Sequence, residues 1–111
     1  MPIIQKLIDA YKIWHIYRLQ FSKELRHSLG IKIDSLFIVI IENIFTATYR
    51  QPGQKDGYLK RASTALDALK FFLRICWEFQ ALNDKKYIAL SLKLNEIGRM
   101  LGGWQKKTIT P

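Results

Sequence analysis

The sequence predicts an all-α protein, an antiparallel up-down-up-down four-helix bundle that residues 1–111 form as a single domain. Apolar residues make up 49% of the 111 residues, which is enough for a core without a metal or a disulfide. These residues recur at spacings of three and four, and no strand-type alternation of convincing length is present. Short breaks separate the periodic stretches. We therefore expect helices at about 3–20, 23–49, 55–81 and 84–103, and a flexible tail at 105–111.

A weak break at residues 20–22 separates the first two helices, and Ser22 is expected to be the N-cap of the second. The first helix has one apolar strip, which contains Ile4, Leu7, Tyr11, Trp14 and Phe21. The second has two neighbouring strips, one of Leu29, Ile33, Leu36, Ile40 and Ala47, and the other of Phe37, Ile41 and Ile44.

The longest break, residues 50–57, contains Pro52-Gly53 and Asp56-Gly57 and divides the chain into two halves. The third helix again has two strips, one of Leu59, Ala62, Leu66, Leu69, Leu73 and Cys76, and the other of Tyr58, Ala65, Ala68, Phe72, Ile75 and Phe79. The fourth begins after an N-cap at Asn83 or Asp84 and has one strip, formed by Tyr87, Leu90, Leu94, Ile97, Leu101 and Trp104. Gly102-Gly103 is expected to fray or end this helix.

The second and third helices thus offer more apolar surface than one bundle core can cover. Each large apolar side chain left in water forgoes about 1.5–3 kcal/mol. We therefore expect self-association, with a subunit interface that contains Phe37, Ile41, Phe72 and Phe79. The alternative is a monomer in which the third helix is the most buried element.

Eighteen Lys and Arg against nine Asp and Glu give a net charge of +9, and residues 51–111 carry +6 of it. Such an excess favours polyanionic partners, although a solvated basic surface is the simpler alternative. The chain start lacks the features of a secretory signal, and the longest apolar run, residues 36–41, is too short to cross a bilayer. We expect a soluble cytoplasmic protein that does not bind membranes.

The sequence contains no arrangement typical of an enzyme. A Gly-rich phosphate loop is absent, and His15 and His27 lack the spacing of metal ligands, so surface positions are expected for both. The single cysteine, Cys76, lies in an apolar run and is expected to be a buried thiol. We predict a protein that is not an enzyme and has no cofactor, metal site or small-molecule substrate.

Basic residues form the most informative pattern. Glu78 and Arg74, and also Asp67 and Lys70, have the spacing of helix-surface ion pairs. The residues expected to contact nucleic acid are Lys60, Arg61, Lys70, Arg74, Lys86, Lys93 and Arg99. Contacts of this kind are made to phosphates, so they depend strongly on salt and carry little sequence information.

Three stretches resemble a known family. Residues 66–74 (LDALKFFLR) and 95–104 (NEIGRMLGGW) are similar to the paired signature of the accessory variability determinant proteins of diversity-generating retroelements. Residues 29–37 (LGIKIDSLF) resemble the wider four-helix-bundle family, which includes proteins encoded in intervening sequences of ribosomal RNA genes.

The resemblance implies a homopentameric barrel of basic four-helix bundles that binds the retroelement's reverse transcriptase and template RNA in mutagenic retrohoming, without being the polymerase. Lys70, Arg74 and Arg99 match the family's basic positions. We therefore expect a non-catalytic accessory protein that binds RNA or DNA beside a reverse transcriptase. The alternative is an oligomeric interaction scaffold of the ribosomal-RNA intervening-sequence type with incidental nucleic-acid affinity.

Overall fold

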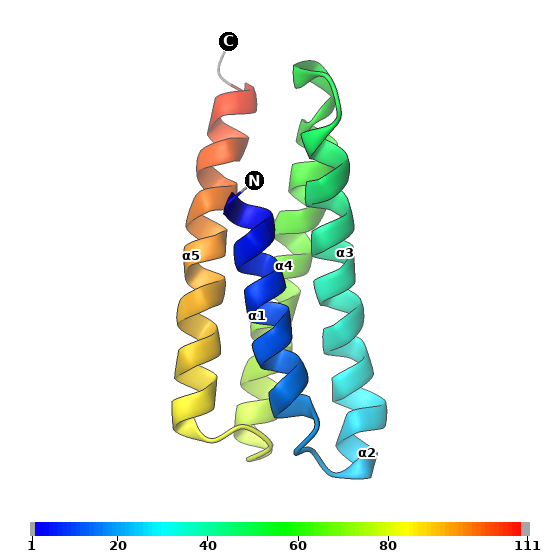
Figure 1. Ribbon diagram of the computed structural model, residues 1–111, viewed down its shortest axis with the longest axis vertical. Helices are drawn as coiled ribbons and strands as arrows, with labels where there is room; N and C mark the ends of the chain where they lie inside the picture. The colour runs from blue at the N-terminus through cyan, green and yellow to red at the C-terminus, as the bar shows by residue number, and fades with distance from the viewer. Residues whose placement is uncertain (1, 110–111) are drawn as a thin grey trace.

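The computed structural model describes residues 2–109. Within them the chain forms four long helical segments and no strand (Figure 1). The first is α1 (Pro2–Arg18), and the second runs without a break through α2 (Lys23–Leu25), the π-helical turn η1 (Arg26–Gly30) and α3 (Ile31–Thr48). The 3-10 turn η2 (Pro52–Gln54) precedes α4 (Asp56–Glu78), and α5 spans Asp84–Ile109. The predicted four-helix bundle is confirmed for the single chain.

Successive segments run in opposite directions, so the bundle has the expected up-down-up-down order (Figure 1). α3 packs against α4 and α4 against α5, while α1 lies between α3 and α5. α5 is longer than α1 and extends beyond its first residue, so one end of the bundle lacks α1 as a neighbour (Figure 1).

Side chains cap two helix starts, as the sequence indicated. The Ser22 hydroxyl accepts a hydrogen bond from the Leu25 backbone N–H at 3.3 Å. Asn83, one of the two predicted candidates, accepts from the Lys86 backbone N–H at 2.9 Å with its side-chain oxygen. These contacts pair backbone donors that have no partner within the helix.

The core contains the strips that periodicity assigned to it. The strip of α4 that begins at Leu59 and ends at Cys76 is buried, and so are four of the six residues in the strip of α5. The second strip of α4 lies at the edge of the core: Phe72 and Ile75 are half-buried and Phe79 is exposed. The doubled apolar surface of α4 is therefore present in the folded chain.

The C-terminal end of α5 differs from the prediction. Gly102-Gly103 does not end the helix, which continues to Ile109, so the tail expected at 105–111 is helical over 105–109. Residues 110 and 111 lie outside the described part of the chain. None of the described glycines has a positive φ, so this pair does not adopt the left-handed conformation that ends many helices.

A contact between α1 and α3 gives a structural role to two residues of the 29–37 stretch, Asp34 and Gly30. Asp34 accepts a hydrogen bond from the buried Trp14 indole at 2.7 Å and forms an ion pair with Arg18 at 2.9 Å. The Arg18 guanidinium also donates to the Arg26 carbonyl oxygen at 3.2 Å. A Cβ at Gly30 would lie 2.8 Å from Arg18 Nε, so a glycine leaves room for this side chain.

Candidate nucleic-acid interface

The seven cationic residues predicted to contact nucleic acid lie on several sides of the bundle, not on one. Lys70 and Arg99 line one polar groove between α4 and α5, together with Ser63, Asp67 and Asn95. The Lys70 ammonium lies 3.4 Å from where a Cβ of Gly98 would be. Lys70 therefore extends across the surface of α5, which brings its charge next to that of Arg99.

Lys86 lies on the side of α5 that faces α1, and the exposed Lys93 lies at the border between that side and the outer surface of α5. The Lys86 ammonium lies 5.4 Å from the centre of the Tyr17 ring and donates a hydrogen bond to Gln20. Lys93 lies beside the ion pair between Lys6 and Glu96, whose atoms are 2.8 Å apart. The hydrogen bond from Lys6 is the main reason that the pKa of the Glu96 carboxyl is lowered.

The remaining three residues have partners within the chain. Arg74 forms the predicted ion pair with Glu78 at 3.4 Å, and Lys60 pairs with Asp56 at 3.3 Å. Arg61 lies toward α3, where its Nε donates to the Asn43 side-chain oxygen at 3.2 Å. The ion pair expected between Asp67 and Lys70 is absent from the described residues, because Lys70 reaches across to Gly98 instead.

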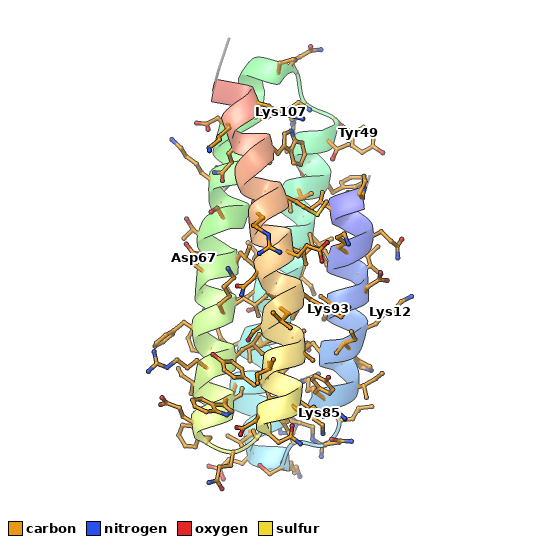
Figure 2. The ribbon with its side chains drawn as sticks, turned by 90° about the vertical axis from the view of Figure 1, so that its left-hand side faces the viewer. Lys12, Tyr49, Asp67, Lys85, Lys93 and Lys107 are labelled. Carbon is orange, nitrogen blue, oxygen red and sulfur yellow. The ribbon has the colours of Figure 1, made fainter. Side chains whose placement is uncertain are left out.

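Five cations lie on or beside the outer surface of α5, and we call this surface the α5 face. Lys85, Lys93 and Lys107 follow one another along the helix in Figure 2. No member forms an ion pair within the described residues, and all but Lys70, which is half-buried, are exposed. The α5 face consists of Lys70, Lys85, Lys93, Arg99 and Lys107.

Lys85 and Lys107 were not among the seven predicted contacts. Lys107 was placed in the flexible tail, because Gly102-Gly103 was expected to end the helix. The continuation of α5 places it instead on the same rigid element as Lys93 and Arg99.

The four residues predicted for a subunit interface differ in exposure. Phe79 is 66% exposed, and Ile41 and Phe72 are half-buried. Phe37 is fully buried in the single chain, where its ring lies 5.2 Å from that of Tyr11. The reason for expecting Phe37 at an interface therefore does not hold, because α1 already covers it.

The histidines and the cysteine lie as expected. His15 and His27 are exposed, and Cys76 is buried, which raises the pKa of its thiol to about 11. In the described part of the chain, no three His, Cys, Asp or Glu side chains are close enough to hold a metal ion. Over the same residues, no helix is long and apolar enough to span a membrane.

The model of the bAvd-like family matches residues 1–108, which include all four helical segments except the last residue of α5. The chain belongs to the bAvd-like family. Its members are accessory variability determinants of diversity-generating retroelements, as the resemblance of the 66–74 and 95–104 stretches indicated. A search of the curated proteins found no match. In this bAvd-like chain the Arg of the 95–104 stretch lies on the α5 face, and its first Gly lies under Lys70.

Proposed function

We propose that this bAvd-like chain is a non-catalytic accessory protein that binds template RNA or its DNA copy through the α5 face, beside a reverse transcriptase. The observation that carries the proposal is a row of cations, four on α5 and one on α4, that form no ion pairs among the described residues. Glu96, the carboxylate that interacts with Lys93 and Arg99, forms its ion pair with Lys6. Lys and Arg that are already paired on a surface contribute less to binding, because a phosphate must replace their partner. None of the five cations of the α5 face forms such a pair among the described residues.

The spacing of these cations suits a polyanion. A helix rises about 1.5 Å per residue, so Lys85 and Lys107 are about 33 Å apart along the axis of α5. Contact along such a length involves several phosphates and releases their counterions. We therefore expect binding that is largely independent of sequence and falls steeply with salt. Arg61, Lys60 and Arg74 then have a weaker role, because each has a partner in the folded chain.

We also propose that the chain forms a homo-oligomer, with five copies by resemblance to the family. Support comes from the second strip of α4, where Phe79 is exposed and Phe72 is half-buried.

The proposed association with a reverse transcriptase draws support from Ile88 and Leu92, which are 56% and 64% exposed on α5 among the cations. Exposed apolar side chains beside charges are typical of protein-binding surfaces. A cytoplasmic location remains part of this proposal.

A pair of charge-reversed variants tests the α5 face. Lys93→Glu with Arg99→Glu lowers the net charge from +9 to +5, and Lys12→Glu with Lys23→Glu makes the same change at exposed lysines of α1 and α2. We expect the first variant to lose at least tenfold in affinity for a single-stranded RNA at low salt, and the second to lose much less. The measurement is fluorescence anisotropy over a range of salt, with circular dichroism to check folding.

Two outcomes would contradict the proposal. Equal losses in both variants would mean that net charge, and not the α5 face, determines binding. Wild-type affinity that barely changes between low and physiological salt would favour the alternative function, an interaction scaffold whose contact with nucleic acid is incidental.

A further inference from the structure

A hollow lies at the end of the bundle where α5 extends beyond α1. Its floor is apolar, and two cations stand at its rim. One of these cations, Lys107, is one helical turn from Trp104, whose half-buried indole forms part of the wall. The residues that line the hollow, apart from one glycine, are Pro2, Ile3, Arg99, Met100, Trp104 and Lys107.

The glycine in the lining is Gly103, and packing against the described residues does not explain it. Glycine is among the least favourable residues inside a helix, yet α5 continues through this position to Ile109. An added Cβ at Gly103 would meet no atom within 4 Å, whereas one at Gly98 would touch Lys70 and Leu66. A side chain at Gly103 would project into the hollow. Its absence keeps the hollow open to something outside the chain.

The residues that line the hollow indicate what kind of ligand it could bind. An aromatic side chain and an apolar lining suit a flat ring, and every nucleobase has a π face that stacks on an aromatic side chain. The Lys55 ammonium lies 5.6 Å from the centre of the Trp104 ring, so a base would contact the part of the indole that Lys55 does not cover. Arg99 and Lys107 form no ion pair among the described residues, so both are free for a phosphate next to the ring. A base in a duplex is stacked between its neighbours and cannot enter. An unpaired nucleotide presents a free ring and a phosphate together.

We propose that this hollow binds an unpaired nucleotide of a single-stranded nucleic acid, with its base against Trp104 and its phosphates on Arg99 and Lys107. The inference rests on the proposed function and adds to it a preference for single strands. The alternative occupant, a second copy of the chain, fits less well, because each copy carries a net charge of +9 and the rim is cationic.

Two leucine variants of neighbouring glycines test the inference. Gly103→Leu fills the hollow, whereas Gly102→Leu adds the same side chain at a position that does not line it and where a Cβ also meets nothing within 4 Å. Both replace a poor helix former with a good one, so both should fold. The probes are a short unstructured RNA and the duplex that it forms with its complement, each measured by anisotropy at one salt concentration.

We expect Gly103→Leu to weaken binding of the single strand by about tenfold, within the range measured for the loss of one stacked base, and to leave duplex affinity within about twofold. Gly102→Leu should leave both affinities unchanged. Gly103→Gln, which also blocks the hollow but adds no exposed apolar group, should match Gly103→Leu.

Other outcomes would overturn the inference. Unchanged single-strand affinity in Gly103→Leu would show that no base enters the hollow, and equal losses for both probes would show that the effect is not specific to unpaired nucleotides. If Gly103→Leu changed the native mass of the assembly but left the ratio of single-strand to duplex affinity unchanged, the hollow would be a contact with a second copy of the chain. In each of these cases the proposed function stands, provided that the wild type binds RNA. A wild type that binds neither probe would overturn both.

Discussion

One carboxylate, Asp34, holds the side chains of Trp14 and Arg18 and so fixes α1 against α3. Neither partner of this carboxylate was predicted from the sequence. Its partners are sixteen and twenty positions away on another helix, and such pairs depend on how helices pack. Spacing along the chain does reveal pairs within one helix, and the contact of Arg74 with Glu78 was predicted for that reason.

Replacement of Asp34 should destabilise the fold. Asp34→Ala leaves the buried Trp14 indole N–H without an acceptor and Arg18 without a counter-charge, so we expect a loss of about 2 kcal/mol in the free energy of unfolding. Asp34→Asn keeps an acceptor for the indole and should cost less. Urea denaturation measures both changes.

The matched control for this carboxylate is Asp67→Ala. Asp67 is exposed and forms no ion pair among the described residues, so its removal should change stability by no more than about 0.5 kcal/mol. If Asp34→Ala proved no more costly than Asp67→Ala, the contact between α1 and α3 would contribute nothing to stability.

At the scale of the helices, the prediction of element type was more accurate than the prediction of element ends. The apolar strips of α4 and α5 predicted both an α-helix and its buried side, because apolar residues that recur every 3.6 residues lie on one side only in an α-helix. The end of α5 was wrong because Gly102-Gly103 was taken as a stop signal, although glycine also occurs inside helices where space is needed. The π-helical turn η1, whose Arg26 carbonyl accepts a hydrogen bond from Arg18 of α1, was not predicted either.

Glycines of α5 and η1 should respond to alanine in opposite directions. Gly102→Ala adds a methyl group in open space, so we expect it to stabilise the fold by about 0.5–1 kcal/mol. Gly30→Ala should destabilise it by about 1–3 kcal/mol, because Arg18 cannot move away without loss of its contacts to Asp34 and Arg26. Thermal or urea unfolding compares the two, and a gain in stability for Gly30→Ala would contradict this role.

At the scale of the whole molecule, the sequence predicted the bundle and the excess of positive charge but not the distribution of that charge. Seven cations were expected to act together, whereas the folded chain places Arg61 toward α3 and pairs Lys60 and Arg74 with carboxylates. Lys60 and Arg74 pair within α4 at a spacing of four residues, whereas the positions of Arg61 and Lys70 depend on contacts between helices. The α5 face could therefore be defined only in the folded chain.

The exposed part of the second strip of α4 should govern assembly. We expect native mass spectrometry to give a multiple of the 13.0 kDa chain, five copies by family resemblance, and Phe79→Ser to shift the distribution toward single chains. Ile16→Ser is the control, because this residue is 58% exposed but lies on α1, on another helix from that strip. An equal response to both changes, or a wild type that is monomeric at all concentrations, would contradict the proposed assembly.

Because cations are distributed over several sides of the bundle, two copies of the chain repel each other electrostatically. Like-charged copies repel over about a Debye length, roughly 8 Å at physiological ionic strength. Salt therefore has opposite effects on the two proposed properties, since it relieves the repulsion between copies while it competes with phosphates. A bound nucleic acid also neutralises the positive charge of the copies that it contacts. Unlike added salt, it does so while it remains bound to them. Chains gathered on one strand would then associate more readily than chains free in solution, and by thermodynamic reciprocity the assembled form would hold the strand more tightly.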